Sequence, residues 1–422
     1  MMLNRNFSFD VVVAGGGTAG VAAALGAAMA GARVAVLERD PYLGGIATHS
    51  GVGAFCVFYT CGDNPVKVVS GAGDLVLEEL KALNPHAAEI IISAAGNKNI
   101  NFHPEYLKCA LDTLMERYHV TLLLHTTITA VRTDAKRMTA LVCHDDEGEF
   151  TVTADAFVDA TGDAALSFMA DLPVQIGDAQ GAVQTATLPF RLCNVDPHRA
   201  YTPAAVEQAV QKGKAAGIPN MTREKGFILQ RKGSTMVTVL LPTAEVKDLS
   251  AMSLTAQEIN TRRQALAYTE AFRRYLPGME HCELALIGPT LGFRESRRMI
   301  GRASLCAADV LERRKSPSGV ARGGWKPEIH RSVNQMATYL DVKNKSYFDI
   351  PLDVLRSAAL DNLFGAGRVV SSDAIAFAAV RVMGTCFATG QAAGAAAAFQ
   401  AKKNACPVTE VQQELKRQGA LV

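Results

Sequence analysis

Residues 9–40, FDVVVAGGGTAGVAAALGAAMAGARVAVLERD, decide the fold of this chain. Residues 9–14 form a nearly continuous apolar run, which is typical of a buried parallel strand. The run leads into a G-x-G-x-x-G motif at residues 15–20, and the small residues 21–31 then predict a helix packed closely on a sheet. Residues 32–37 predict a second strand, and Glu38 stands at its carboxyl end. This order of elements predicts a βαβ unit that binds a dinucleotide.

Each glycine of the motif has a physical role in such a site. Gly15 allows a tight turn, Gly17 lets the backbone approach a pyrophosphate, and Gly20 permits close contact between helix and strand. The amino terminus of the following helix offers free N–H groups to the anion. Glu38 follows Gly15 by 23 residues, so it is placed to accept hydrogen bonds from a ribose hydroxyl pair.

Length and composition limit the class of protein. A chain of 422 residues has room for two domains, or for one large domain with an insertion. The formal net charge of +2 gives no electrostatic reason to expect nucleic-acid binding. No apolar run reaches the roughly 18 residues that span a bilayer, and the first apolar stretch is itself a strand, so we expect a cytoplasmic protein without a membrane span. The nine cysteines are scattered, which predicts reduced thiols and no metal site.

The remaining patterns predict an α/β fold with an insertion. A β-hairpin is expected at 141–154, and helices are expected at 71–83 and from His103-Pro104 onward. From about residue 172 the texture changes to strands at 187–195 and 234–242 and helices at 203–216 and 255–275. We therefore predict a Rossmann-like domain with a parallel sheet and a β-hairpin or meander, interrupted by an α+β substrate or cap domain with an antiparallel sheet. The predicted boundaries are 1–171, 172–285 and 286–422, the last part returning to the first domain.

Several further strings resemble one known family. They are LGGIATH (43–49), FHPEYLK (102–108), VDATGD (158–163), GFRESRRMIG (292–301), GGWKPEIH (323–330), and an ending that runs from NLFGAGR (362–368) to RVMGTCFATGQAAG (381–394). Together with GGGTAG they resemble the FAD-dependent oxidoreductases of the glutathione-reductase-like superfamily, of an uncharacterised bacterial type. The resemblance covers nearly the whole chain and implies bound FAD, the fold and a redox reaction.

The resemblance also implies which residues contact FAD. The helix that starts near residue 383 would point its amino terminus at the flavin ring, although Gly384 stands where family members often have proline. The expected cofactor-binding residues are Gly15, Gly17, Thr18, Ala19, Gly20, Glu38, Arg39, Gly44, Gly45, Ala47, Thr48, Ile128, Ala160, Thr161, Gly162, Asp373, Met383, Gly384 and Thr385.

Cys56 and Cys61 allow two interpretations. They are either a redox-active disulfide beside the flavin or two buried thiols. In disulfide reductases the pair follows the paired glycines almost immediately, whereas Cys56 lies 11 residues past Gly45. Those enzymes also carry a second G-x-G-x-x-G for NADPH, and this chain shows none. We therefore favour two thiols.

The expected reaction is hydride transfer between a small polar metabolite, which can carry a carboxylate, and flavin N5. The candidate catalytic residues are His49, His330, Arg294, Arg297 and Arg381, with His103 and Tyr59 as further proton-transfer candidates. Read as the start of a helix, residues 294, 297 and 298 would share one face and grip a carboxylate. The equal alternative is an Arg–Glu network, around Glu295, that braces two domains. The basic run at 312–326 is interpreted as a solvated loop.

Two other functions remain open from the sequence. One is a dinucleotide-binding, non-redox enzyme that resembles the thiazole-forming enzymes, because Glu38 suits either NAD or FAD. The other is the flavin subunit of a larger electron-transfer complex. The expected partner is a small-molecule substrate, and a homo-oligomer or an electron-transfer partner is left open, as is the choice among dehydrogenase, oxidase and reductase.

Overall fold

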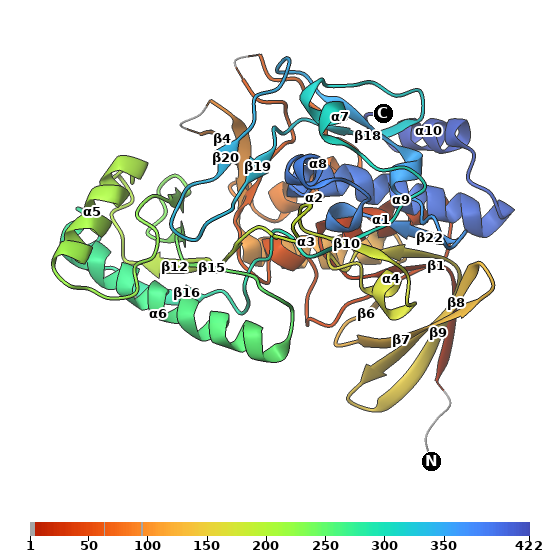
Figure 1. The fold of residues 1–422 in the computed structure, drawn as a ribbon, viewed down its shortest axis with the longest axis horizontal. Coiled ribbons are helices and arrows are strands. Elements are labelled where there is room, and N and C mark those ends of the chain that lie inside the picture. The colour runs from red at the N-terminus through yellow and green to blue at the C-terminus, as the bar shows by residue number, and fades with distance from the viewer. Residues whose placement is uncertain (1–4, 63, 94–95) are drawn as a thin grey trace.

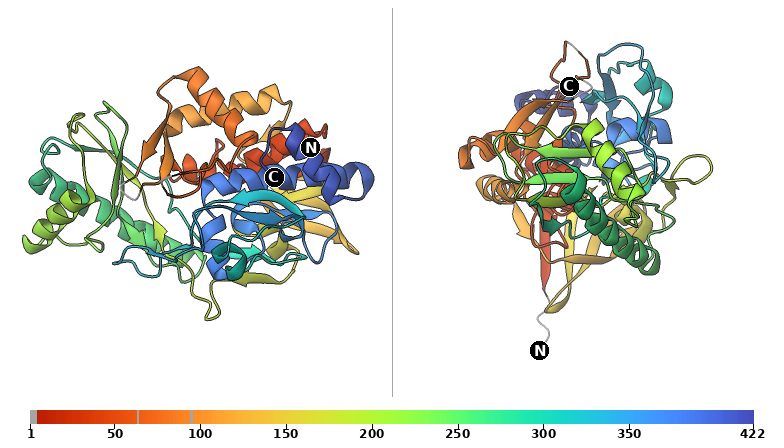
Figure 2. Two further views of the ribbon diagram at one scale, coloured as in Figure 1. Left: turned by 90° about the horizontal axis from the view of Figure 1, so that it is seen from above. Right: turned by 90° about the vertical axis from the view of Figure 1, so that its left-hand side faces the viewer.

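A computed structural model describes residues 5–62, 64–93 and 96–422 of the chain. The ribbon has two lobes (Figure 1), a larger one built on a central sheet and a smaller one that carries α5 and α6. Figure 2 shows the smaller lobe at one end of the molecule.

The central sheet mixes parallel strands with an antiparallel hairpin. Its order is β6 (Thr121–Leu123), β2 (Val34–Leu37), β1 (Asn6–Ala14), β9 (Gly148–Asp159), β8 (Arg137–Asp145) and β7 (Thr127–Asp134), with β22 (Leu363–Gly365) also paired to β9. Strands β6, β2, β1, β9 and β22 run parallel, and β7, β8 and β9 form an antiparallel meander. The first half of β9 pairs with β8, and its last residues pair with β22. The C-terminal part of the chain therefore returns to the sheet that the N-terminal part begins.

The second half of strand β1, residues 11–14, is buried on both faces, as is typical of a parallel strand. Val11 and Val13 face the core that contains the long helices, whereas Val12 and Ala14 face the core under the β7–β8 hairpin. The helices of the first core are α1 (Thr18–Met29), α2 (Ala72–Leu83), α3 (Pro104–Arg117), α9 (Met383–Lys403) and α10 (Val408–Arg417).

Helices α1 and α9 approach each other closely because glycines line their contact. A Cβ on Gly390 would lie 2.2 Å from the carbonyl oxygen of Ala19, and one on Gly394 would lie 1.9 Å from that of Ala23. Gly26 of α1 faces the backbone of Gln391 in the same way, at 2.3 Å. The two backbones are therefore nearly in contact, and both helices start beside the carboxyl end of β1.

The smaller lobe has its own core between a sheet and two helices. The antiparallel order is β13 (Phe227–Gln230), β14 (Val237–Leu240), β12 (Phe190–Cys193) and β16 (Glu283–Ile287), and the helices are α5 (Pro203–Ala215) and α6 (Ala251–Tyr275). Tyr268 and Phe272 of α6 are fully buried against this sheet. A short pair, β11 (Ala186–Thr187) and β15 (Thr243–Ala244), connects the lobe to the rest of the chain.

The remaining elements are short and lie around the larger lobe. They are β3 (Ala54–Phe55), β5 (Lys98–Phe102) and β4 (Ala88–Ile92) in one sheet; the pairs β10 (Val174–Ile176) with β17 (Arg297–Met299), β18 (Gly319–Gly323) with β21 (Phe348–Pro351), and β19 (Glu328–Ile329) with β20 (Thr338–Tyr339); the helices α4 (Ala165–Met169), α7 (Ala307–Leu311) and α8 (Ala374–Val380); and the 3-10 turns Gly45–Ala47, Leu352–Val354 and Gly367–Val369.

The predicted fold class is confirmed, and two local predictions are wrong. Residues 294–302 do not enter a helix: Arg297–Met299 is strand β17, which pairs with β10, so Arg297 and Arg298 point to opposite sides. The basic run at 312–326 is not wholly a loop, because Gly319–Gly323 pairs with β21. The domain boundaries at 171 and 285 remain predictions.

Among the residues that the structure describes, no single helix is both long enough and apolar enough to cross a bilayer. Helices α8 and α9 meet that test only when taken together, and they are bent by 94°.

We expect Gly394→Ala to destabilise the protein, because the added methyl has no room against the Ala23 carbonyl. Overpacking of a close core contact costs about 1–3 kcal/mol, which exceeds the gain of roughly 1 kcal/mol in helix propensity. Urea unfolding measures the change, with Ala401→Ser in the half-exposed end of α9 as the control. A Gly394→Ala protein as stable as the control would contradict this account of the α1–α9 contact.

Candidate functional site

A cavity of about 420 Å³ lies where the parallel strands end. Its wall is formed by the loops after β1, β2 and β9, by the turn after β22, and by the start of α9. In open α/β sheets ligands bind outside the carboxyl ends of the strands, so the topology places a ligand here.

The glycine loop fits a dinucleotide. Gly15 has a φ of +93°, and a Cβ there would lie 2.8 Å from the carbonyl oxygen of Ala160. At Gly17, by contrast, the nearest atom to a Cβ is the Cα of Gly45 at 3.9 Å. Gly17 therefore leaves open space above the backbone at the start of α1, which suits a pyrophosphate approaching the free N–H groups of that helix. These observations fit the phosphates of FAD.

The loop after β2 is fixed against the glycine loop. The Gly44 amide donates to the Gly16 carbonyl at 2.8 Å, and a Cβ on Gly45 would lie 2.9 Å from the Cα of Gly17. The Thr48 hydroxyl donates to the Leu43 carbonyl at 2.6 Å. Gly44 and Thr48 thus shape the loop, whereas Gly45 lines the cavity.

Glu38 lines the cavity and is held by backbone amides. Its carboxylate accepts hydrogen bonds from the Gly16 amide at 2.7 Å and from the Asp40 amide at 3.0 Å. Burial raises the pKa of Glu38, although these two amides favour its ionised form. Each carboxylate oxygen has a second lone pair, so Glu38 can still accept from ribose hydroxyls.

The loop after β9 is held by a carboxylate that sequence analysis missed. Asp159 is fully buried and accepts from the Thr161 hydroxyl at 2.7 Å and from the Leu166 amide at 2.9 Å. Burial raises the pKa of Asp159. Its contacts fix the turn that presents Ala160, Thr161 and Gly162 to the cavity.

The other end of the cavity is formed by the turn after β22 and by α9. Gly367 has a φ of +68° and passes close to Ala19 and Cys386. Arg368 donates to the Phe293 carbonyl at 2.5 Å and lies 4.0 Å from the Asp163 carboxylate. Met383, at the start of α9, also lines the cavity, whereas the next amide, that of Gly384, donates to the Cys56 carbonyl at 3.2 Å.

His49 lies in the cavity wall with a fixed partner. Its Nδ1 is 2.9 Å from the Asp40 carboxylate and 3.4 Å from the Tyr42 hydroxyl. The carboxylate holds the ring with a proton on Nδ1, which leaves Nε2 free to interact with a ligand.

A second group of polar side chains adjoins this end of the cavity through Arg381. This buried polar cluster consists of Arg223, Arg294, Trp325, Glu328, His330, Tyr339 and Arg381, and Tyr339, which is 39% exposed, forms its outer edge. Arg381 lines the cavity, and its guanidinium donates to the Glu328 carbonyl at 3.0 Å and lies 3.6 Å from the Glu328 carboxylate. The carboxylate also receives Tyr339 at 2.8 Å and Trp325 at 3.2 Å. Glu328 is therefore the centre of the cluster.

The cluster holds more positive than negative charge. Arg223, Arg294 and Arg381 share the single carboxylate of Glu328, and Arg294 donates only to the Thr185 carbonyl at 2.6 Å. Burial, and then the nearby charge of Arg381, lower the pKa of Arg294 to about 9. Burial opposes ionisation of Glu328, yet hydrogen bonding from His330 and the charge of Arg381 hold the pKa of this carboxyl well below its usual range. The cluster therefore suits an anionic ligand.

His330 is neutral in this setting. Burial, and then the charge of Arg294, lower its pKa to about 3. Its Nε2 is 3.2 Å from the Glu328 carboxylate, which places the proton on Nε2. The Nδ1 atom is buried and has no partner among the described residues, and the same is true of the Arg381 Nε and the Thr185 hydroxyl. These unpaired atoms of His330, Arg381 and Thr185 therefore belong to the cluster with excess positive charge or to a residue that contacts it.

The structure brings together fourteen of the predicted site residues and leaves ten elsewhere. Those in the cavity wall are Gly15, Gly17, Thr18, Ala19, Glu38, Arg39, Gly45, His49, Ile128, Ala160, Thr161, Gly162, Arg381 and Met383; those outside it are Gly20, Gly44, Ala47, Thr48, Arg294, Arg297, His330, Asp373, Gly384 and Thr385. Of the second group, Arg294 and His330 belong to the buried polar cluster.

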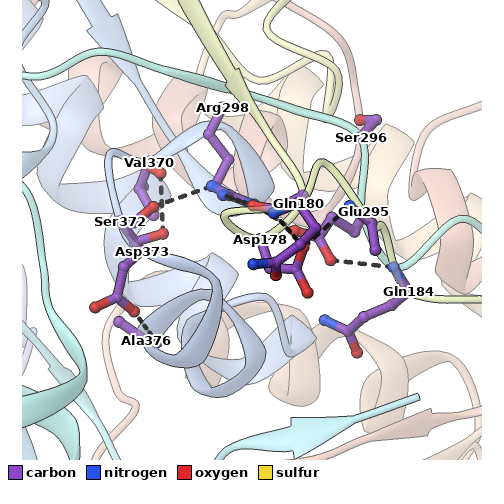
Figure 3. Close-up of polar contacts among 12 residues, drawn as sticks. Asp178, Gln180, Gln184, Glu295, Ser296, Arg298, Val370, Ser372, Asp373 and Ala376 are labelled. Carbon is purple, nitrogen blue, oxygen red and sulfur yellow. Dashed lines mark hydrogen bonds and ion pairs between the residues drawn. The ribbon is translucent and has the colours of Figure 1, made fainter. Parts of the chain in front are cut away.

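The arginines of 294–298 have separate roles instead of one shared face. Arg298 is fully buried, contacts the Glu295 carboxylate and donates to the Ser372 carbonyl at 3.0 Å (Figure 3). Glu295 also accepts from the Gln184 amide at 3.1 Å. Arg297 donates to the Asp163 carbonyl at 2.8 Å and lies over the ring of Phe168. The Arg–Glu network thus braces segments that are distant in sequence, and among these arginines Arg294 alone joins the cluster.

Asp373 and Gly384 are likewise occupied by local structure. Asp373 caps α8 by accepting from the Ala376 amide at 2.8 Å (Figure 3), and its other oxygen accepts from the Ala307 amide at 2.6 Å. A Cβ on Gly384 would lie 2.4 Å from the Cys56 carbonyl oxygen, so the space needed for proline is absent.

Cys56 and Cys61 are free thiols that are half-buried, and burial raises the pKa of Cys56 to about 12, so its thiol is protonated. Among the residues described, no group of three or more His, Cys, Asp or Glu side chains is arranged to hold a metal ion.

Several residues of the site were missed by sequence analysis. Arg223 is distant in sequence from Glu328 and Tyr339, which face each other across the β19–β20 pair. Glu328 belongs to the GGWKPEIH string but was given no role, and no motif marks Arg223 or Tyr339. Arg368 was detectable, since it ends the NLFGAGR string, but its side chain was given no role. Thr126 and Thr127, at the start of β7, also line the cavity, and the sequence around them carries no motif that predicts this.

Comparison with known proteins agrees with the fold and the cavity. Residues 10–418 match the family model described as FAD dependent oxidoreductase. A search of curated proteins by sequence gives no match.

Solved structures with the same fold differ widely in sequence. One is a geranylgeranyl bacteriochlorophyll reductase-like protein from Thermoplasma acidophilum, with a TM-score of 0.50 and 14% identity over 98% of this chain and 83% of that one. Another is BexE, studied for oxidation during BE-7585A biosynthesis, with a TM-score of 0.51 and 12% identity over 97% of this chain and 66% of that one. At these identities the likeness shows the fold alone.

We expect Gly17→Ala to weaken FAD binding by about tenfold or more, because its methyl enters the space that the pyrophosphate needs. The fold should be unaffected, since no protein atom lies closer than 3.9 Å to that Cβ. Fluorescence titration of the apoprotein with FAD measures the affinity, and the apoprotein melting temperature reports the fold. Gly53→Ala, outside the cavity, is the control. Wild-type FAD affinity in Gly17→Ala would remove the glycine loop from the cofactor site.

We expect His330 to make stability depend on pH. Its pKa falls from the usual 6.5 to about 3 on folding, so the unfolded chain binds the proton more readily between these values. Stability contributed by neutral His330 is therefore present above pH 6.5 and is lost as the pH falls. From pH 6.5 to 5 the loss is about 1.5 kcal/mol.

His330→Gln, which keeps a donor toward Glu328, should lack this component. Urea unfolding at pH 6.5 and 5 gives the change in the free energy of unfolding between these pH values for each protein. The difference between the two changes isolates the contribution of His330, because the other titrating groups are the same in both proteins. Parallel pH profiles would show that His330 is not held neutral.

Proposed function

The chain belongs to the FAD-dependent oxidoreductase family, and on that basis we propose that it transfers a hydride between FAD and a small metabolite that carries a carboxylate. The observation that carries the substrate class is the excess positive charge of the buried polar cluster, beside the cavity that fits FAD. Family membership favours this redox role over the non-redox alternative.

FAD would occupy the cavity with its phosphates at the start of α1. Gly15, Gly17, Thr18 and Ala19 would contact the pyrophosphate, and Glu38 would accept from the ribose. The loop around Gly45 and the turn at 160–162 would follow the rest of the cofactor. When bound, FAD supplies the hydride acceptor or donor of the reaction.

Arg294 and Arg381 would bind the substrate carboxylate. Arg381 lines the cavity, and Arg294 lies beyond the cavity wall in the buried polar cluster. The Arg381 guanidinium is 3.6 Å from the Glu328 carboxylate, and Arg294 donates to the backbone carbonyl of Thr185. A guanidinium binds a carboxylate through parallel hydrogen bonds, which also orients the carbon next to it. The unpaired Thr185 hydroxyl can donate to the same group.

His330 would accept the proton that leaves during substrate oxidation. In that direction the C–H bond next to a hydroxyl or amino group breaks, its electron pair leaves with the hydride to FAD, and a C=O or C=N bond forms as the heteroatom loses its proton. Nδ1 of His330 is unpaired, and Glu328 holds the proton on Nε2. A bound carboxylate would offset the charge of Arg294 and make His330 more basic.

His49 would contact the cofactor rather than the substrate, because it lines the cavity together with Asp40 and does not belong to the buried polar cluster. Arg297 would hold the turn at Asp163, and it is not proposed to contact substrate.

We expect 2-hydroxy or 2-amino acids to bleach the flavin absorption of the FAD-loaded protein under anaerobic conditions. Rapid mixing then separates binding from hydride transfer. Arg294→Met should weaken substrate binding by about 10- to 100-fold through the loss of a charged hydrogen bond. His330→Gln should bind substrate normally and slow the limiting rate of bleaching by about 10²- to 10⁴-fold.

Arg331→Gln, an exposed neighbour of His330, is the matched control and should behave as wild type. A protein that binds no FAD would end the redox proposal. If FAD binds and neutral alcohols or amines bleach it as well as the acids do, the carboxylate assignment is wrong. Full-speed bleaching in His330→Gln would exclude its role in proton transfer.

A further inference from the structure

A second, smaller cavity lies between the two lobes, away from the site described above. Its volume is about 40 Å³, which holds roughly three water molecules or one small oxyanion. The wall combines the end of β5 and the start of α3 from the larger lobe with β12 and β14 from the cap sheet. The residues that matter for its chemistry are Asn101, His103, Arg191 and Arg231.

Two guanidinium groups give this interlobe cavity a positive wall. Arg191 is 8% exposed, and its Nη2 is buried with no hydrogen-bond partner among the described residues. Arg231 is half-buried, and no carboxylate in the described part of the chain forms an ion pair with it. Burial lowers the pKa of Arg231, and the nearby charge of Arg191 lowers it further, because two like charges share a poorly solvated space.

The carboxylates near the cavity do not neutralise this charge. Glu105 lies 3.5 Å from Arg191, but it is exposed and is tied more closely to Lys108, at 2.8 Å. Glu89 acts on Arg231 only at a distance and is 3.6 Å from His86. The cavity therefore keeps an excess of positive charge that a ligand can offset.

Helix α3 adds donors to the same wall. His103 caps this helix by accepting from the Glu105 amide at 3.3 Å through Nδ1, so its proton is on Nε2 and available to a ligand. Burial, followed by the charges of Arg231 and Arg191, lowers the pKa of His103, so the ring is neutral. The partial positive charge of the helix amino terminus also favours an anion.

One acceptor distinguishes which oxyanion fits. Asn101 is 4% exposed, lines the cavity, and has an Oδ1 atom without a partner. A phosphate group carries both charged oxygens for the guanidinium groups and, in its monoprotonated form, a hydroxyl that can donate to Asn101. Carboxylate and sulfate offer no donor at neutral pH.

We propose that the interlobe cavity binds a phosphate group, either of inorganic phosphate or of a phosphate monoester. The ligand would be held by Arg191 from the cap sheet and by His103 and Asn101 from the larger lobe, so that it would join the two lobes. Arg191 also borders the segment that leads to the FAD cavity, since a Cβ on Gly51 would be 3.5 Å from its Nη2 and Ser50 lines that cavity.

The test uses the FAD-loaded protein in phosphate-free buffer, so that the cofactor occupies the first cavity. Isothermal titration calorimetry at constant ionic strength with inorganic phosphate, glycerol 3-phosphate, sulfate and acetate measures binding. We expect saturable binding of a phosphate compound that Arg231→Gln weakens, and weaker binding of sulfate to the same cavity. Acetate that binds the buried polar cluster should bind wild type and Arg231→Gln equally. Tighter binding of glycerol 3-phosphate identifies a monoester as the ligand, and tighter binding of inorganic phosphate identifies the free ion.

Two variants connect the binding to this cavity. Arg231→Gln and Arg191→Met should each weaken phosphate binding by about 10- to 100-fold. Lys232→Gln, the exposed neighbour of Arg231, should bind as wild type. Arg191→Met should also melt no lower than wild type without phosphate, because it removes a buried charge that lacks a full partner.

Absence of saturable binding, or equal binding by wild type and Arg231→Gln, would overturn the proposal. Acetate that binds as tightly as phosphate and is weakened equally by Arg231→Gln would overturn the phosphate assignment. None of these results bears on hydride transfer, which is measured separately by flavin bleaching.

Discussion

The close contact of helices α1 and α9 is the constraint on which the rest of the structure depends. Gly390 and Gly394 let the backbone of α9 touch that of α1, and Gly20 lets α1 touch the Gly15 carbonyl. Both helices therefore start at the carboxyl edge of the parallel sheet, and the first residues of α1 and Met383 of α9 line one cavity. Ala19 and Gly390, which meet in this contact, are about 370 residues apart in the sequence. The cavity therefore exists only in the folded chain.

The fold could be read from the sequence because its signals are local. Residues 9–40 carry strand, turn, helix and strand in an order that one structure satisfies, and the apolar spacing of the cap helices is regular. The GxGxxG loop and Glu38 were found for the same reason. The error at 294–302 has a physical cause: three arginines at helical spacing also fit a strand whose residues alternate, and pairing with β10 decides between them.

The substrate end of the site could not be predicted, because it is made by tertiary contact. Glu328 was part of a quoted string but had no partner in it; Arg223, Arg294, Tyr339 and Arg381 approach it from separate elements. Their sequence positions carry no periodicity that would bring them together. A motif search identifies residues near the dinucleotide, whose geometry is common to the fold, and it misses the residues that face a substrate.

The electrostatics of that end imply a mechanism of selectivity that is independent of the cofactor. Three guanidinium groups around one carboxylate are costly to keep away from water, and the lowered pKa values of Arg294 and His330 express that cost. The proposed anionic substrate would remove the imbalance, so part of its binding free energy would come from offsetting the excess positive charge. A neutral substrate would displace water without that gain. The proposed charge selectivity would thus be a property of the folded chain before any reaction begins.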